Sequence, residues 1–135
     1  MGCAGIKNIV ITMDILDIRE LCMELPCTEE TLPFDETTLV YKVAGKMFAI
    51  TDMEQSDRIT LKCDPDKGIM LRDSYDEIAE AYHMNKKHWI TVWLNGDLPS
   101  ELIRELVRES YANVVAKLPL KQRQQLQELL DEYSH

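Results

Sequence analysis

Short runs in which apolar and polar residues alternate place the strongest limit on what this chain can fold into. Residues 39–43 and 46–51 flank Ala44-Gly45, a pattern that predicts a β-hairpin with a tight turn. Residues 58–63 and 89–94 alternate in the same way. Because successive strand residues point to opposite faces, each run has an apolar side and a polar side. Such alternation is typical of an antiparallel sheet with one face toward solvent.

Helical segments surround these strands. Apolar residues recur at helical spacing in residues 14–25, 99–118 and 120–133, and Asp64-Pro65 is typical of the start of a shorter helix. We therefore predict an α+β fold in the order helix, three strands, helix, strand, two helices. The helix 99–118 should pack across the apolar face of the sheet. The residues expected to be buried there are Ile90, Val92, Leu94, Leu106 and Val114.

Two segments carry no strand pattern. Residues 26–38 are polar and contain Pro33, so we expect a loop there. Residues 75–82 are interpreted as a loop or a second short helix. The chain of 135 residues has the length of one domain, so residues 13–135 are predicted to form it. Residues 1–12 are interpreted as an extension, either native or added by an upstream start.

Charge and cysteine content narrow the class of protein. The net charge of −9 opposes a general attraction to nucleic acid or to anionic lipid. The four cysteines form no Cys-x-x-Cys pair, which favours free thiols in a reducing cytoplasm. No stretch approaches the roughly 20 apolar residues of a membrane span, so no membrane partner is expected.

A window without acidic residues is the strongest candidate for a binding surface. No Asp or Glu occurs between Ala81 and Gly96, although the chain as a whole is acidic. Cations and aromatic rings together can hold nucleic-acid phosphates and bases. Alternatively, the lysines form a solvated turn and the tryptophans belong to the core. The candidate contact residues in this window are His83, Asn85, Lys86, Lys87, His88, Trp89 and Trp93.

Three strand lysines extend this candidate surface. Lys42, Lys46 and Lys62 are predicted to project from the solvent side of the sheet. A phosphate-binding surface would exist only if they converge with the cations of the window. A second window without acids, Ser110–Gln127, contains Lys117, which we interpret as ordinary charge at a helix end.

The sequence gives little support for a metal site or for a catalytic site. Asp17, Glu20 and Glu24 form an acidic stripe on the first helix, interpreted as a solvated face or as a weak ridge for divalent cations. His83 and His88 are five residues apart and would face opposite sides of a strand, so no zinc site is predicted. No phosphate-binding glycine loop or hydrolase motif occurs. We expect a protein that is not an enzyme and needs no cofactor.

Several runs resemble one known family. They are Thr38–Ala49, Leu61–Pro65, Tyr82–Trp89 and the long helix with Leu102-Ile103, Ser110-Tyr111 and Val114-Val115. These runs are similar to those of the MmcQ/YjbR family, the segment Tyr82–Trp89 most specifically. The resemblance implies a fold related to frataxin/CyaY proteins. It also implies the DNA-binding label that the family carries for its double-wing shape, and no established catalysis.

The expected function is therefore a non-enzymatic module that binds DNA weakly and with strong salt dependence. Replacing Lys86 and Lys87 by alanine is expected to weaken that binding. One alternative is a protein-interaction module that uses Trp89 and Trp93 as an apolar contact. A weak, frataxin-like cation binder that uses the acidic stripe is the other.

Overall fold

A six-stranded antiparallel sheet forms the centre of the protein, in the order β1-β2-β3-β4-β6-β5. The computed structural model describes residues 13–81 and 84–133, so the predicted extension 1–12 lies outside the described residues. All five neighbouring pairs are antiparallel, as predicted. The strands are β1 (Thr28–Thr31), β2 (Thr38–Val43), β3 (Lys46–Asp52), β4 (Arg58–Lys62), β5 (Ile78–Glu80) and β6 (Trp89–Trp93).

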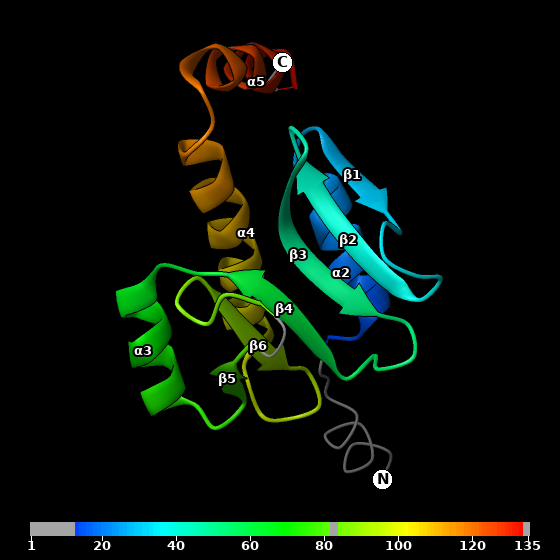
Figure 1. Ribbon diagram of the computed structural model, residues 1–135, viewed down its shortest axis with the longest axis vertical. Coiled ribbons are helices and arrows are strands. Elements are labelled where there is room, and N and C mark those ends of the chain that lie inside the picture. Colours follow the sequence, from blue (N-terminus) through cyan, green and yellow to red (C-terminus); the bar gives the residue numbers. More distant parts are fainter. Residues whose placement is uncertain (1–12, 82–83, 134–135) are drawn as a thin grey trace, which may run out of the picture.

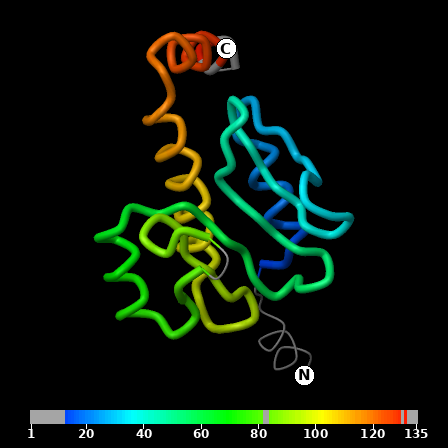
Figure 2. The backbone as a smooth tube through the Cα atoms, in the orientation of Figure 1, coloured from blue at the N-terminus to red at the C-terminus, as the bar shows by residue number. Residues whose placement is uncertain are grey.

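The four described helices are α2 (Ile15–Glu24), α3 (Pro65–Ser74), α4 (Ser100–Ala116) and α5 (Leu120–Tyr133). Two of them, α2 and α4, lie on one side of this sheet, whereas α3 lies beside its β5 margin and α5 lies beyond its end (Figure 1). Figure 1 is viewed from the opposite side, with α2 and α4 behind the strands. The helix α4 lies against β3 and β4, and α2 lies against β1. The tube in Figure 2 follows the chain out of the sheet layer at the end of α4, where α5 turns away from it. No described helix is both long and apolar enough to cross a membrane.

The β2–β3 hairpin closes as its sequence predicts. Ala44 has φ 51° and Gly45 has φ 78°, and positive φ at both central residues is the geometry of a two-residue hairpin turn. Glycine adopts such a φ without steric cost, whereas alanine is strained there. The register of β2 against β3 shifts between Tyr41 and Lys42, so Phe48 forms a bulge opposite them.

A serine hydroxyl joins α4 to the sheet. The ladder between β3 and β4 runs from Thr51/Ile59 to Ala49/Leu61. Beyond it, the backbone N–H of Lys62 donates to Ser110 Oγ at 2.9 Å, and Ser110 Oγ–H donates to the carbonyl of Phe48. Ser110 is fully buried. Its hydroxyl therefore takes the place of a strand-to-strand hydrogen bond and fixes the position of Lys62 relative to α4.

The core contains the residues predicted for it. Ile90, Val92, Leu94, Leu106 and Val114 are all buried, which confirms the packing of the long helix against the apolar sheet face. Ile59 and Leu61 are buried while Arg58, Thr60 and Lys62 are partly exposed, as strict alternation requires. The predicted first helix also forms, with Asp14 as its N-cap and Leu25 as its C-cap.

Two expectations about the loops are wrong. Residues 28–31 form β1 within the expected loop 26–38, and residues 78–80 form β5 where a loop or helix was expected. The order is therefore helix, four strands, helix, two strands, two helices. The buried Tyr41 hydroxyl donates to Glu30 Oε2 at 3.0 Å, and Arg19 Nε lies 2.7 Å from the same oxygen. This network ties β1 to both β2 and α2, although β1 has no apolar pattern.

Candidate nucleic-acid interface

The sheet face opposite α2 and α4 carries a regular ladder of side chains on β4 and β6. Arg58 lies opposite Trp93, Thr60 opposite Thr91, and Lys62 opposite Trp89. At one end the Arg58 guanidinium carbon is 4.2 Å from the centroid of the Trp93 ring. At the other end Lys62 Nζ is 5.8 Å from the centroid of the Trp89 ring. Both distances are within reach of a cation–π interaction. Each tryptophan is therefore paired with a cation from the neighbouring strand.

A groove of about 590 Å³ opens on this face around Trp93. Its centre is formed by residues of three strands, Ile50, Thr60 and Thr91, and by Ala79 of β5. Its volume lies within the range of roughly 300–1,000 Å³ typical of small-ligand sites. The remaining lining residues are Phe34, Asp35, Thr38, Thr51, Asp52, Gln55, Arg58, Met84 and Trp93.

The carboxylates at the rim of the groove also hold local turns. Asp35 Oδ1 accepts hydrogen bonds from the backbone N–H groups of Thr37 at 2.9 Å and Thr38 at 2.7 Å. These hydrogen bonds lower the pKa of Asp35 below its ordinary value. Asp52 Oδ1 accepts from the N–H of Glu54 at 2.8 Å. This rim is therefore negatively charged, which disfavours a phosphate group at this end of the face.

Two lysines, Lys62 and Lys117, line one small cavity at the other end of the ladder, and Lys46 lies near enough to Lys62 to influence its charge. Burial lowers the pKa of Lys62, and the nearby ammonium groups of Lys117 and Lys46 lower it further. We call Lys46, Lys62 and Lys117 the lysine cluster. In the part of the chain that the structure describes, none of the three belongs to an ion pair. The small cavity between Lys62 and Lys117, about 60 Å³ in volume, is also lined by His88 and Asn113.

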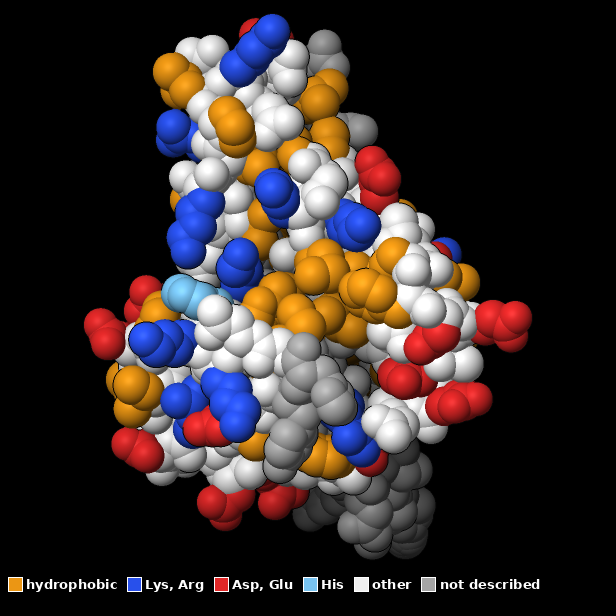
Figure 3. All heavy atoms as spheres, viewed as in Figure 1, with side chains coloured by type: hydrophobic (Ala, Val, Ile, Leu, Met, Phe, Trp, Pro, Cys, Tyr) orange, Lys and Arg blue, Asp and Glu red, His pale blue; other side chains and the backbone are white. Residues whose placement is uncertain are grey.

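The surface in Figure 3 shows the same separation of charge. Lys and Arg side chains are most frequent in the upper and left parts of this view, and Asp and Glu side chains lie along its right, lower and left edges. Hydrophobic side chains occupy the middle of the face between them. A chain with a net charge of −9 therefore still presents a locally basic area next to an apolar one.

The predicted contact residues are only partly brought together. Lys46, Lys62, His88 and Trp89 lie at the lysine cluster, and Trp93 lies at the groove. Lys42 instead has Glu29 and Met47 as cross-strand neighbours. His83 lies outside the described residues.

The turn before β6 holds the remaining candidates. The backbone N–H of Lys87 donates to Asn85 Oδ1 at 3.0 Å, so Asn85 shapes the turn. Lys86 Nζ is 3.7 Å from Glu80 Oε2, which offsets part of its charge. Lys87 is exposed.

Sequence reasoning assigned no binding role to two residues of this region, Lys117 at the end of α4 and Arg58 on the sheet. Lys117 was interpreted as charge at a helix end, yet the fold places it beside Lys62, 55 positions earlier in the chain (117 − 62). Its window without acids was the signal that could have identified it. Arg58 was placed only on the solvent side of its strand, and its stacking on Trp93 depends on the register between β4 and β6.

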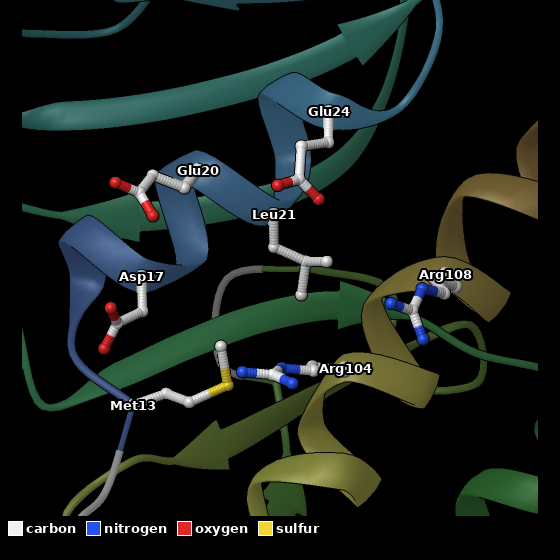
Figure 4. A pocket seen from close by; sticks show the side chains of 7 residues that line it. All are labelled: Met13, Asp17, Glu20, Leu21, Glu24, Arg104 and Arg108. Carbon is white, nitrogen blue, oxygen red and sulfur yellow. The ribbon is translucent and has the colours of Figure 1, made fainter.

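The acidic stripe of α2 faces a second pocket, shown in Figure 4. Asp17, Glu20 and Glu24 line one wall of this cavity of about 240 Å³, and Arg104 and Arg108 of α4 line the other. Asp17 Oδ2 also accepts the backbone N–H of Asp14 as part of the helix cap. Among the described residues, no group of three His, Cys, Asp or Glu side chains is arranged to hold a metal ion. The guanidinium groups give this pocket a mixed charge that disfavours a cation.

We predict that calcium, magnesium or iron at physiological levels leaves the NMR shifts of Asp17, Glu20 and Glu24 unmoved. The opposing Arg104 and Arg108 side chains provide the reason, since like charges repel across a narrow groove. The control is the double variant Arg104→Gln/Arg108→Gln, which removes both positive charges and keeps polar side chains. Saturable shifts confined to the three carboxylates of the unsubstituted protein would contradict the prediction.

The fold and site together define a small α+β protein whose antiparallel sheet leaves one face free of described helices and carries a local lysine cluster. The YjbR family model matches residues 23–113. The chain is 37% identical over 98 residues to the uncharacterized protein YbdF of Escherichia coli O157:H7, covering 72% of this chain and 80% of YbdF. It is 33% identical over 118 residues to the uncharacterized protein YjbR of Escherichia coli K12, covering 87% of this chain and all of YjbR.

Solved structures agree with this assignment. The Deinococcus radiodurans protein DR2400, with a DUF419 domain, superposes with a TM-score of 0.80 at 44% identity, over 85% of this chain and 88% of that one. A protein from Pseudomonas syringae superposes with a TM-score of 0.62 at 28% identity, over 73% and 96%. The chain belongs to the YjbR family.

Proposed function

We propose that this protein is a non-enzymatic nucleic-acid-binding module that holds phosphate groups at the lysine cluster. The observation that carries the proposal is that Lys62 and Lys117 line one small cavity together with His88, beside the Trp89 ring that lies 5.8 Å from Lys62 Nζ. The lowered pKa of Lys62, to which burial, Lys117 and Lys46 contribute, agrees with this arrangement. Ammonium groups held close together repel one another, and an anion between them relieves that repulsion. Phosphate groups of a nucleic-acid backbone supply such anions at regular spacing.

The tryptophans favour nucleic acid over a protein partner. Trp89 is 7% exposed and lies beneath Lys62, and Trp93 is stacked by Arg58. Little indole surface of Trp89 is left for an apolar contact with another protein. Trp93 is partly exposed, so its ring can stack on a base.

The thiols support a role without catalysis. Cys22 and Cys63 are buried, and burial raises the pKa of each thiol above its ordinary value. A thiol in that environment remains protonated at neutral pH and is a poor nucleophile. These two cysteines therefore serve packing.

The double variant Lys62→Ala/Lys117→Ala is expected to weaken DNA binding about tenfold or more. The slope of the logarithm of the binding constant against the logarithm of the salt concentration should become less steep by about two units, one for each lost phosphate contact. Wild-type affinity is expected in the range of roughly 10⁻⁴ to 10⁻⁶ M, because the bulk of the protein repels the DNA. The measurement is fluorescence anisotropy with labelled DNA at several salt concentrations.

The matched comparison is Lys86→Ala/Lys87→Ala, which removes the same charge from the neighbouring turn. We expect it to weaken binding by less, because Glu80 already pairs with Lys86. Wild-type protein that shows no salt-dependent binding even at low ionic strength would contradict the proposed function. A larger effect of Lys86→Ala/Lys87→Ala than of Lys62→Ala/Lys117→Ala would place the contact on the turn instead.

A further inference from the structure

We infer that the groove around Trp93 receives an unpaired nucleobase, so that the preferred ligand is a single strand rather than a duplex. This inference rests on the proposed function, because it needs the phosphates of the same strand at the lysine cluster. Lys62 and the groove belong to one face of β4 and β6, where Arg58 and Lys62 are the first and last residues of β4. Lys117 reaches the same end of β4 from the end of α4. Four residues of strand separate the Cα atoms of Arg58 and Lys62 by about 13 Å, which a short extended stretch of nucleic acid can cover.

The shape of the groove suits a planar, uncharged group. Ile50, Ala79 and Met84 supply apolar surface in its lining. At one end, the Arg58 guanidinium and the Trp93 indole are themselves stacked at 4.2 Å. Aromatic rings and guanidinium planes are the surfaces on which proteins stack unpaired bases.

The polar groups of the groove suit the edge of a base. The hydroxyls of Thr60 and Thr91 can both donate and accept hydrogen bonds, whereas that of Thr38 donates to Asp35 Oδ2 at 3.0 Å and can accept one. The carboxylates of Asp35 and Asp52 can accept a hydrogen bond from an exocyclic amino group and repel phosphate. The charges thus orient the ligand, with its backbone at the lysine cluster and its base at the groove.

A duplex does not satisfy this arrangement. Its bases are paired and stacked inside the helix, so none can enter a groove about 590 Å³ in volume on a protein surface. A single strand exposes its bases without the free-energy cost of breaking base pairs. The lysine cluster alone accepts either ligand, whereas the groove distinguishes between them.

The test compares the affinity for a fluorescein-labelled, mixed-sequence DNA single strand with the affinity for the corresponding duplex. Both affinities are measured for wild type and for Trp93→Leu. We expect wild type to bind the single strand about tenfold or more tightly than the duplex. Base stacking contributes roughly 1–3 kcal/mol per base, so Trp93→Leu should weaken single-strand binding by about 5- to 150-fold. Duplex binding should remain at the wild-type value, because the lysine cluster is intact. Circular dichroism confirms that the variant is folded.

A second readout does not depend on the Trp93→Leu variant. The chain has two tryptophans, so Trp89→Phe leaves Trp93 as the only indole, and a stacked base should quench its fluorescence. Equal wild-type affinity for both ligands, or a single-strand preference that Trp93→Leu leaves intact, would overturn the inference while the proposed function stands. If neither ligand binds in a lysine-dependent manner, the proposed function fails as well.

Discussion

Replacing Ser110 by alanine is expected to lower the free energy of unfolding by about 2–4 kcal/mol, since each buried group left without a partner costs roughly 1–3 kcal/mol. Two backbone groups lose their partner together. They are the N–H of Lys62, which donates to Ser110 Oγ, and the carbonyl of Phe48, which accepts from it. Ser110 is fully buried, so water cannot replace the hydroxyl without entering the core.

Urea unfolding followed by circular dichroism measures this loss. Ser100→Ala is the matched control, because Ser100 begins the same helix and makes no side-chain hydrogen bond within the described part of the chain. It should change stability by no more than about 0.5 kcal/mol. If Ser110→Ala lowers the free energy of unfolding as little as Ser100→Ala does, the Lys62 N–H and the Phe48 carbonyl bond to each other directly once the hydroxyl is gone. The hydroxyl then does not join α4 to the sheet in the way described.

Stability is expected to fall steeply as the pH rises above about 9, because several buried weak acids keep their protons only in the folded state. Burial raises the pKa of the Cys22 thiol from 9.0 to about 12, with a further contribution from the Glu30 carboxylate. Burial likewise raises the pKa of Tyr111 from 10.0 to about 12. For Tyr41, burial and the hydrogen bond to Glu30 raise the pKa above the ordinary 10.0.

The sign follows from proton counting. Between the unfolded pKa and the folded pKa, the unfolded chain has lost a proton that the folded protein retains, so rising pH favours unfolding. The contribution of Cys22 is fully present below pH 9.0 and is lost between pH 9.0 and about 12. Between its unfolded pKa and its folded pKa, each such group lowers the free energy of unfolding by about 1.4 kcal/mol per pH unit.

Urea unfolding at several pH values from about 8 to 11 measures the slope. Between about pH 9.5 and 11, Cys22→Ala should make the fall of the free energy of unfolding with pH less steep, by the amount that corresponds to about one proton. Leu21→Ala is the control, because it removes buried volume from the same helix without removing a thiol. It should lower stability at every pH and leave the slope unchanged. A wild-type curve that is flat up to about pH 11 would contradict the assigned burial of Cys22.

The strands that sequence patterns predict are those with one face in the core. Residues 58–63 alternate because the side chains of Ile59 and Leu61 are buried in the core while those of Thr60 and Lys62 are partly exposed. Neither β1 nor β5 could be found in this way. Strand β1 is Thr-Glu-Glu-Thr and is held by hydrogen bonds and by the Arg19–Glu30 ion pair, and β5 has only three residues.

The candidate site likewise contains some residues that the sequence predicts and others that it does not. Lys42 and Lys62 were predictable because alternation assigns each residue to a face of the sheet. The expectation that Lys46 projects from the solvent side is wrong, because the bulge at Phe48 shifts the alternation and places Lys46 directly opposite the buried Val43.

Lys117 was not predictable, because its position beside Lys62 depends on the length of α4 and on how that helix crosses the sheet. The pairing of Arg58 with Trp93 depends on register, which neither segment encodes by itself.

The two outermost strands have a consequence for how copies of the protein meet. Strands β1 and β5 are four and three residues long, and they occupy the two margins of the sheet. A short margin offers few free backbone groups to a strand from another molecule. Charged side chains also stand on both margins, Glu29 and Glu30 on one and Glu80 on the other, and a strand from another molecule would have to bury them. The sheet is therefore protected against growth into fibrils even though β2, β3, β4 and β6 are rich in residues that favour strands.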